Sequence, residues 1–361
     1  MKKICWITEA WAFDTDKGIV PYLIKEKEYD IKWYILCKET DTSIKESTNY
    51  TIIKIPYRYR DLRNIFYYYK IFDRIRIKKY DIIYSSALGM PYYYPILFLQ
   101  KGSKQPLIHA AHNVIPYPVW TWQMKLYIKY IFKINKHFQL FSKFTSDYFK
   151  KNYPHKSFFY CPMTLKCYGE ITTNNYKIDN NKLNLLFFGN VVLNKRLDLL
   201  INAVKDLPKE IKSQVHLTIA GKCNNPQQYI NLIDNDDSIS TYFKRIDDKE
   251  IAELFSKHDF LVLPYQDVAQ SGPHMIAYYY NLPVIASDID GFKERVIDNV
   301  NGFLFKSKDK DDLKMKIIKA ANMSDGDKVT MKVNLKRFSE DNFSLKVVSK
   351  KYIEYFNSLI Q

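Results

Sequence analysis

Continuous apolar runs alternate with amphipathic segments along most of the chain. In the first half these runs span residues 3–8, 33–37, 51–55, 81–86 and 106–111. Runs that are apolar at successive positions are typical of strands buried on both faces, and amphipathic segments between them are typical of covering helices. The alternation therefore predicts an α/β fold with a parallel sheet between two layers of helices.

The same alternation begins again in the second half, after a polar, asparagine-rich segment at 172–182 that predicts a linker or loop. Its expected strands are 183–190, 215–221, 260–265 and 283–287, and its expected helices are 197–207, 248–256 and one that begins at Pro273. The last segment, 343–360, has the pattern of an amphipathic helix.

Two β/α domains with a cleft between them are the simplest organisation of this pattern. We expect the first domain at residues 1–170 and the second at 171–342, with the C-terminal helix, 343–361, joined to the first. A chain of 361 residues is long enough for two full cores, and a hydrophobic content of 47% indicates a globular protein.

Membrane spans and disulfides are not expected. No apolar run reaches the roughly 18 to 20 residues that cross a bilayer, and the N-terminal segment MKKICWITEAW has the pattern of a strand and not of a signal peptide. The five cysteines are odd in number and scattered, and Cys161 and Cys167 lack the second pair that a zinc site needs. We expect reduced thiols, no metal and a cytoplasmic protein.

The net charge of +16 is concentrated in one half of the chain. Residues 1–170 hold 28 Lys and Arg against 14 Asp and Glu, whereas residues 171–361 hold 27 against 25. This asymmetry predicts an anionic surface or an acidic partner for the first half.

Basic and aromatic residues are interleaved in two segments of that half, 57–80 and 120–138. Such a mixture on helices suits an anionic membrane surface, because cations attract the lipid and rings lie at headgroup depth. A solvated helix face is the alternative, and no nucleic-acid-binding module is recognisable. The candidate residues are Arg58, Arg60, Arg63, Lys70, Arg74, Arg76, Lys78, Lys79, Trp120 and Trp122.

Two motifs of the second half are suited to a phosphate. Gly189 follows a strand and precedes a loop with Lys195, so the ammonium is expected at the carboxyl end of the sheet, where ligands bind in such folds. Ser271-Gly272-Pro273 precedes a helix, whose first N–H groups and positive dipole end attract an anion. A solvated loop lysine and an ordinary serine cap are the alternatives.

His112 lies just after an expected strand, three residues beyond His109. A histidine at this place can act on a hydroxyl nucleophile or donate a hydrogen bond to a sugar. A loop histidine with a structural hydrogen bond is an equally compatible interpretation.

Taken together, the motifs resemble the retaining GT-B glycosyltransferases of family 4, particularly those of bacterial capsule and exopolysaccharide assembly. The resemblance is strongest over residues 183–320, where FFGNVVLNKRLDLLINAV, LTIAG, DKEIAELFSKHDFLVLPY, QSG, NLPVIASDIDGFKERV and NGFLF occur in the family's order and spacing. In the first half, HNVIP at 112–116 looks like the family's acceptor-side histidine loop, and FSK at 141–143 follows it.

The resemblance implies two Rossmann-like domains that face each other across a cleft. The C-terminal domain would bind a UDP- or GDP-sugar, and the N-terminal domain would bind the acceptor. Lys195 would neutralise the departing diphosphate, and His112 would contact the donor sugar, with no cofactor or metal required. The donor-binding residues implied are Gly18, Gly189, Asn190, Arg196, Gly221, Arg245, Ile246, Gln270, Ser271, Gly272 and His274.

This chain departs from the family's pattern at the turn before Pro273. The family usually has two glutamates eight residues apart there, and the corresponding residues are Val268 and Ile276. Asp267 replaces the first acid with a shift of one position. Asn190 stands where the family has an arginine, so that Lys195, with Arg196, carries the charge.

We therefore expect a retaining hexosyltransferase at the inner face of the plasma membrane that extends a lipid-linked oligosaccharide in surface polysaccharide synthesis. The first alternative is an inactive relative that serves as a binding or scaffold subunit, which the two missing glutamates favour. The second is a sugar-nucleotide epimerase of the same fold, for which the basic aromatic segments have no role.

Overall fold

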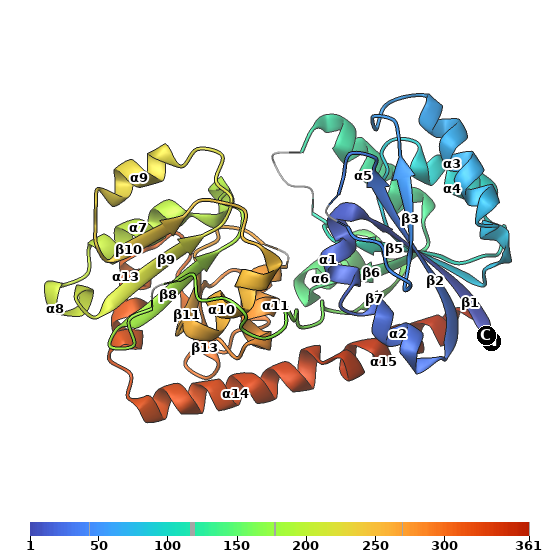
Figure 1. Ribbon diagram of the computed structural model, residues 1–361. Coiled ribbons are helices and arrows are strands. Elements are labelled where there is room, and N and C mark those ends of the chain that lie inside the picture. The colour runs from blue at the N-terminus through green and yellow to red at the C-terminus, as the bar shows by residue number, and fades with distance from the viewer. Residues whose placement is uncertain (43, 116–119, 177, 269, 361) are drawn as a thin grey trace. The chain divides into compact units, whose positions relative to one another are not determined.

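The chain forms two compact units, which are described separately (Figure 1). The computed structural model describes residues 1–42, 44–115, 120–176, 178–268 and 270–360. Unit 1 consists of Met1–Thr164 and Leu345–Gln361, and unit 2 consists of Leu165–Ser344.

The described part of unit 1 is built on a parallel sheet of seven strands in the order β3-β2-β1-β4-β5-β6-β7. The five strands expected from the apolar runs are all present, and the short strands β6 and β7 were not predicted. The strands are β1 (Lys2–Glu9), β2 (Tyr29–Lys38), β3 (Thr51–Ile55), β4 (Ile82–Ser86), β5 (Leu107–Ala111), β6 (His137–Leu140) and β7 (Ser157–Tyr160).

Helices flank this sheet, and a 3-10 helix follows the carboxyl end of β1 directly (Figure 1). The α-helices are α1 (Phe13–Asp16), α2 (Val20–Glu26), α3 (Arg63–Arg74), α4 (Tyr93–Gln100), α5 (Trp122–Ile134), α6 (Lys143–Asn152) and α15 (Leu345–Ile360). The short 3-10 helices are η1 (Ala10–Ala12) and η2 (Ile77–Lys79).

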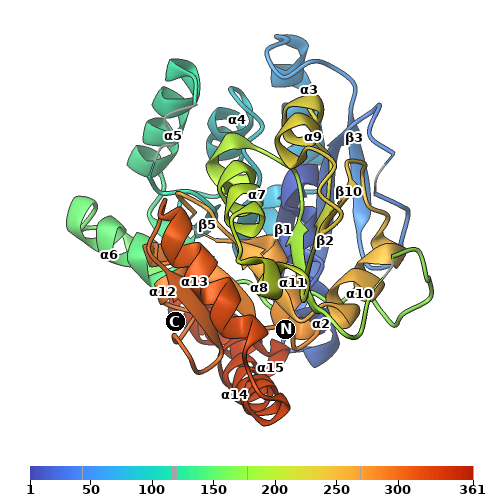
Figure 2. The ribbon, with the colours of Figure 1, turned by 90° about the vertical axis from the view of Figure 1, so that its left-hand side faces the viewer.

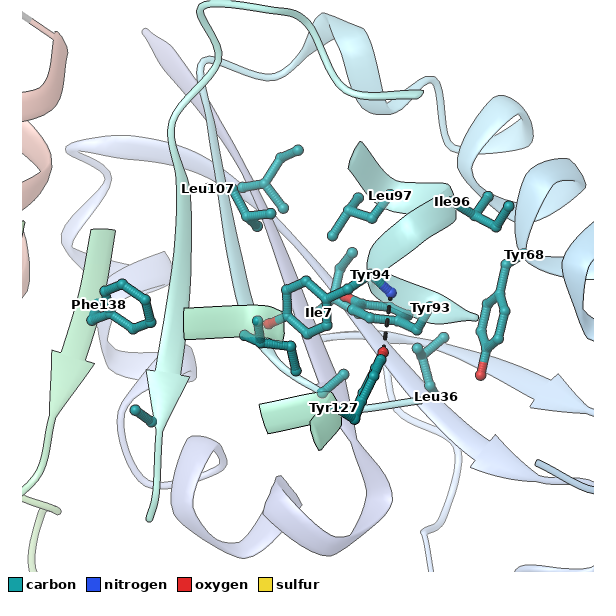
Figure 3. Close-up of a cluster of buried hydrophobic side chains, with 14 of the residues drawn as sticks. Ile7, Leu36, Tyr68, Tyr93, Tyr94, Ile96, Leu97, Leu107, Tyr127 and Phe138 are labelled. Carbon is teal, nitrogen blue, oxygen red and sulfur yellow. Dashed lines mark hydrogen bonds between the residues drawn. The ribbon is translucent and has the colours of Figure 1, made fainter. Parts of the chain in front are cut away.

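An aromatic-rich core joins α3, α4 and α5 to one face of the sheet (Figure 3). Tyr68 of α3, Tyr93 and Tyr94 of α4 and Tyr127 of α5 are all buried, and the Tyr127 hydroxyl accepts a hydrogen bond from the Tyr94 main-chain N–H at 3.3 Å. These aromatic residues occupy the sides of the helices that face the sheet. The basic and apolar residues on the opposite sides of the helices remain at the surface.

The described part of unit 2 has a second parallel sheet, of six strands in the order β10-β9-β8-β11-β12-β13. Its order reverses between β8 and β11, so the loops after these two strands flank a topological switch point. The strands are β8 (Leu183–Phe188), β9 (Val215–Ala220), β10 (Ile239–Tyr242), β11 (Phe260–Leu263), β12 (Val284–Ser287) and β13 (Gly302–Phe305).

The helices of unit 2 cover both faces of its sheet, and α7 and α13 pack against each other on one of them (Figure 2). The helices are η3 (Leu193–Lys195), α7 (Leu197–Lys205), α8 (Lys209–Lys212), α9 (Gln227–Ile233), α10 (Asp248–Lys257), α11 (Gly272–Tyr279), α12 (Asp290–Lys293), α13 (Lys310–Ala321) and α14 (Asp325–Phe343).

The C-terminal helix begins at Leu345, two residues later than predicted. Ser344 has an extended backbone (φ −60°, ψ 151°) and separates it from α14, which ends at Phe343. Within unit 1, Tyr352 of α15 packs on the Trp6 and Tyr84 rings, with centroid distances of 5.5 and 5.9 Å. Residue 361, which the prediction included, lies outside the described residues.

Candidate functional site

The loop after β8 brings Lys195 close to the end of its strand. Gly189, the first residue after β8, has a φ of +106°, which favours glycine. A Cβ on Gly189 would lie 2.8 Å from Lys195 Nζ and 3.6 Å from Pro273 Cγ. Any larger residue at this position would displace the ammonium, so Gly189 makes room for Lys195 beside the start of α11.

The helix α11 begins with a capped first turn at the same place. The Ser271 hydroxyl accepts a hydrogen bond from the His274 main-chain N–H at 3.4 Å, and Gly272 and Pro273 occupy the first helical positions. Pro273 has no N–H, and the N–H of His274 is used by the cap, so the Gly272 N–H is the donor of this first turn without an intrahelical acceptor. The structure thus brings Gly189, Lys195, Ser271 and Gly272, which the sequence analysis selected, to one place at the switch point.

Hydrogen bonds tie the loop after β8 to the loop after β11. The Gln266 N–H donates to the Asn194 carbonyl at 2.9 Å, and Asn194 Nδ2 donates to Asp267 Oδ1 at 3.2 Å. The carboxylate of Asp267 is therefore engaged in holding these loops together. Asn194 has this role although the sequence analysis did not select it, because a single asparagine in a loop carries no distinguishing pattern.

Burial lowers the pKa of the Lys195 ammonium to about 8. Its Nζ lies 5.3 Å from the centroid of the Tyr265 ring, and it forms no ion pair with a carboxylate of the described residues. A desolvated cation of this kind is stabilised by an anion that binds next to it.

Gly221, at the end of β9, allows the two neighbouring loops to approach. Its φ is +152°, and a Cβ there would lie 2.0 Å from the Gly189 carbonyl oxygen. Arg245 is exposed and Ile246 is buried, and both lie between β10 and α10. Gly221, Arg245 and Ile246, the residues assigned to a nucleobase, therefore lie after β9 and β10. In the sheet β9 is the neighbour of β8, the strand that precedes Gly189.

Three further residues assigned to the donor lie close to these loops along the chain. Asn190 is exposed, and Gln270 is half-buried directly before the Ser271 cap. Arg196 binds the carboxylate of Asp198 through Nε and Nη2, at 3.0 and 2.9 Å. The guanidinium of Arg196 is therefore engaged with Asp198. Of the two neighbouring cations, Lys195 is the one whose side chain reaches Gly189.

The His274 side chain lies in the core of unit 2 and not at the helix start. It is fully buried, with its ring against those of Tyr278 and Phe292 at centroid distances of 4.2 and 5.6 Å. Burial lowers its pKa well below the ordinary value, so the ring is neutral. Within the described ranges, neither ring nitrogen has a hydrogen-bond partner. Only the main-chain N–H of His274 belongs to the site.

Lys166 is a second lysine at the start of α11, and the sequence analysis missed it. Its N–H donates to the Met275 carbonyl at 3.2 Å, and its Nζ lies 3.4 Å from the position of a Cβ on Gly272. The residue precedes the first strand of unit 2 and belongs to no phosphate-binding pattern, so only the folded chain reveals its place.

In unit 1, His112 lies in the loop at the carboxyl end of a strand, and Gly18 lies in the turn between α1 and α2. His112 follows β5, and its ring stacks on Phe141 at a centroid distance of 4.5 Å. A Cβ on Gly18 would lie 2.5 Å from Thr164 Oγ1, so the loop is closely packed there. Residue 116, the last of the HNVIP segment, lies outside the described residues. His109 is buried in the core, where its Nδ1 is hydrogen-bonded to the Tyr94 hydroxyl.

Exposed apolar residues accompany the basic residues on the outer faces of α3 and α5. Leu62 and Phe66 are 68% and 72% exposed beside α3 cations, and Trp122 of α5 is 67% exposed, whereas Trp120 is half-buried. The eight selected basic residues are all exposed, from Arg58 before α3 to Lys79 after it. We call these residues the basic–aromatic face: Arg58, Arg60, Leu62, Arg63, Phe66, Lys70, Arg74, Arg76, Lys78, Lys79 and Trp122.

The described residues contain neither a helix that could span a membrane nor a cluster of metal-ligating side chains. Within those ranges, no helix is both long and apolar enough to span a membrane. In the same residues, no group of three or more His, Cys, Asp or Glu side chains could hold a metal ion.

The second half of the chain matches a known family. Residues 170–336 match the family model described as glycosyl transferases group 1. This segment is similar to the group 1 glycosyl transferases. The chain is 29% identical over 182 residues to an uncharacterized glycosyltransferase of Methanocaldococcus jannaschii. The matched segment is 50% of this chain and 46% of the relative. The chain is 25% identical over 136 residues to an uncharacterized protein in the cps region of Klebsiella pneumoniae, covering 38% and 36%. The chain thus spans less than half the length of these relatives.

Solved glycosyltransferase structures share the fold over nearly the whole chain. A glycosyltransferase of Rickettsia africae has a TM-score of 0.76 at 16% identity, with 100% of this chain and 99% of that one covered. The Anabaena protein HepE in complex with UDP-glucose has a TM-score of 0.72 at 14% identity, with 99% and 100% covered. Together with the two parallel sheets, these similarities confirm the predicted GT-B fold, with its two Rossmann-like domains.

Proposed function

We propose that the protein is a glycosyltransferase that takes a hexose from a nucleotide-diphosphate sugar. The observation that carries the proposal is the meeting of Lys195, Gly189 and the capped start of α11 at the switch point of the sheet in unit 2. A buried ammonium and a helix N-terminus together are suited to a diphosphate. The similarity of residues 170–336 to the group 1 glycosyl transferases supports this proposal, as does the shared fold of the Anabaena protein that holds UDP-glucose.

In the proposed reaction, the bond between the anomeric carbon and the diphosphate oxygen breaks, and an acceptor hydroxyl oxygen bonds to that carbon. Negative charge develops on the departing diphosphate, and the hydroxyl proton leaves with it. Lys195 and the Gly272 N–H at the start of α11 oppose this charge without reorganisation, which is the largest catalytic contribution available at such a site. The proposal includes retention of configuration and requires neither metal nor cofactor.

For the acceptor, we propose a lipid-linked oligosaccharide of surface polysaccharide synthesis, reached at the inner face of the plasma membrane. The basic–aromatic face supports this part of the proposal, because exposed cations and rings on α3 and α5 suit an anionic lipid surface. The similarity to a protein from the cps region of Klebsiella pneumoniae also supports it. His112, at the end of β5, is the residue of unit 1 proposed to contact the donor sugar.

A binding subunit without transferase activity is the second candidate. Val268 and Ile276 favour it, because both lack the carboxylates of the family pattern and Ile276 is only 4% exposed within α11. Such a protein would bind the nucleotide sugar and release no nucleoside diphosphate from it. A sugar-nucleotide epimerase would need no acceptor and would leave the basic–aromatic face without a role.

Thermal unfolding with a panel of nucleotides tests the donor directly. A ligand of the folded state at about 100 times its Kd adds about 2.7 kcal/mol to the free energy of unfolding. We expect UDP or GDP, and a sugar conjugate of the same nucleotide, to raise the unfolding midpoint more than uridine or guanosine does. No shift with any nucleoside diphosphate would refute the proposed function. A shift without diphosphate release in the presence of membrane extract would favour the binding subunit.

A further inference from the structure

A groove lies in unit 1 between the helix α3 and β3, the strand at one end of the sheet. Its volume is about 740 Å³, within the range of roughly 300 to 1,000 Å³ that is typical of small-molecule sites. Apolar and basic side chains line it, among them Ile53 of β3 and Tyr67, Lys70, Ile71, Arg74 and Ile75.

The floor of the groove is apolar. Ile71 is only 7% exposed, and Ile53 and Ile75 are half-buried where they pack against the core of unit 1. The Tyr67 hydroxyl donates a hydrogen bond to the Lys54 carbonyl, so the polar end of this ring is satisfied within the protein. The floor therefore presents hydrocarbon and ring surface, which is stabilised when another hydrocarbon covers it.

Two exposed cations, Lys70 and Arg74, lie on the same side of α3 as this floor. The lining positions 67, 70, 71, 74 and 75 have the spacing of one helix side, and none of the described lining residues is acidic. Arg63 binds Asp61 at 2.7 Å, whereas neither Lys70 nor Arg74 forms an ion pair with a carboxylate of the described residues. Like charges four residues apart on a helix repel each other, so an anion bound between them stabilises both.

The ligand that fits this combination carries an acidic group and hydrocarbon in one molecule. Lysine and arginine are suited to a phosphate, and the arginine fork can contact two of its oxygens at once. On the neighbouring side of α3, Leu62, Phe66 and Tyr69 are 68%, 72% and 56% exposed, a pattern typical of a helix at a lipid surface. A phospholipid at that surface supplies both the phosphate and the hydrocarbon.

We propose that the groove between β3 and α3 binds one anionic phospholipid, with an acyl chain on the apolar floor and the phosphate between Lys70 and Arg74. This inference rests on the membrane part of the proposed function and goes beyond it. Any anionic surface attracts the basic–aromatic face, whereas the groove selects a single lipid by its charge and its chain. A lipid held in this way fixes the orientation of α3 at the bilayer.

Short-chain lipids distinguish this site from a general attraction to a charged surface, because they dissolve as single molecules. Calorimetry with dioctanoyl phosphatidylglycerol, below the concentration at which it forms micelles, measures the binding of one lipid to the wild-type protein. Glycerol phosphate lacks the chains, and in dioctanoyl phosphatidylcholine the choline offsets the phosphate charge. We expect one phosphatidylglycerol to bind per chain and each comparison ligand to bind at least about tenfold more weakly.

Two variants alter the groove itself. Lys70→Gln combined with Arg74→Gln removes both charges and leaves the apolar floor. Thr51→Trp fills the groove from the exposed start of β3 and leaves the charges in place. We expect each variant to lose at least about tenfold in affinity for dioctanoyl phosphatidylglycerol, as for the loss of a charged contact or of the space for the chain.

Each variant has a matched control. Lys78→Gln combined with Lys79→Gln removes two exposed charges of the basic–aromatic face outside the groove, and Thr241→Trp places the same ring on the exposed side of β10, which lies at the edge of the sheet in unit 2. Both controls should bind the short-chain lipid within a few-fold of the wild type. Unfolding midpoints establish that every variant is folded.

Unchanged affinity in the groove variants, or an equal loss in their controls, would overturn this inference. Dimerisation that Thr51→Trp abolishes would assign the groove to a second copy of the chain and would also overturn it. Sedimentation with vesicles of equal parts phosphatidylcholine and phosphatidylglycerol separates the two proposals. A wild-type protein that binds these vesicles but no single lipid contradicts this inference alone, and one that binds neither contradicts the membrane part of the proposed function as well.

Discussion

Lys195 combines burial, proximity to a glycine and the absence of an ion pair with any carboxylate of the described residues. Burial lowers its pKa from 10.5 to about 8, so the ammonium is present at neutral pH at a cost in solvation. A bound diphosphate reverses this effect, because an opposite charge favours the protonated form. The affinity of the site for a diphosphate is therefore expected to fall when the pH rises above the pKa of Lys195.

This linkage predicts how donor affinity depends on pH. Below about pH 8 the free protein already carries the Lys195 proton, whereas above it the proton must be taken up on binding. We expect the affinity for the nucleoside diphosphate to be constant from pH 6.5 to 7.5 and to fall by up to about tenfold per pH unit above 8.

Calorimetry from pH 6.5 to 9.5 measures this dependence. In Lys195→Arg the guanidinium stays charged over the whole range, so the fall should disappear. An identical fall in wild type and Lys195→Arg would assign the pH dependence to another group.

At the scale of elements, α3 and α5 each present one face to the core and another to the surface. Tyr68, Ile71 and Phe72 of α3 are buried in the core of unit 1, whereas Leu62 and Phe66 are exposed. The core-facing side of α3 is already filled, yet large apolar residues remain exposed among its cations. Such a surface is typical of a site that binds a membrane or another molecule.

Charge reversal on the basic–aromatic face should weaken membrane binding. Each basic residue near an anionic bilayer contributes about 1 kcal/mol, so changing Arg74, Arg76, Lys78 and Lys79 to Glu should shift most of the protein into the supernatant when it is sedimented with anionic liposomes. Added salt should weaken the binding of the wild type, because it screens exposed charges.

The matched control reverses four cations of α14 in unit 2, Lys328, Lys332, Lys336 and Arg337. It should leave liposome binding close to that of the wild type. Binding that is unchanged by the reversal in unit 1, or equally weakened by the control, would refute docking through the basic–aromatic face.

At the scale of the whole molecule, the sequence predicts the parts of the fold that depend on local pattern. Buried parallel strands such as β1 and β8 are continuous apolar runs, and the Ser271 cap before Pro273 is a local signal for a helix start. The four-residue strands β6 and β7 escaped prediction because they contain polar residues, His137, Gln139 and Ser157, whereas the equally short β11 lies in a continuous apolar run.

The candidate site was predictable only where its residues lie within motifs. Gly189 and Lys195 follow a recognisable strand, and the structure places Gly189 close to Lys195 and Pro273. Lys166 was missed because its place depends on a long-range contact with α11, and His274 was assigned to the site although its side chain turns into the core. The pattern gives the position of a residue along a helix, but the packing around it decides which way the side chain points.

The transfer reaction of Lys195→Ala tests the central claim most directly. The donor identified by thermal unfolding is incubated with membrane extract, and the released nucleoside diphosphate is measured for wild type, Lys195→Ala and the control Lys336→Ala. We expect Lys195→Ala to fold normally and to lose at least about 100-fold in rate, as when one preorganised contact to developing charge is removed. The control should keep the wild-type rate. Full activity in a folded Lys195→Ala protein would contradict the assignment of this site to the departing diphosphate.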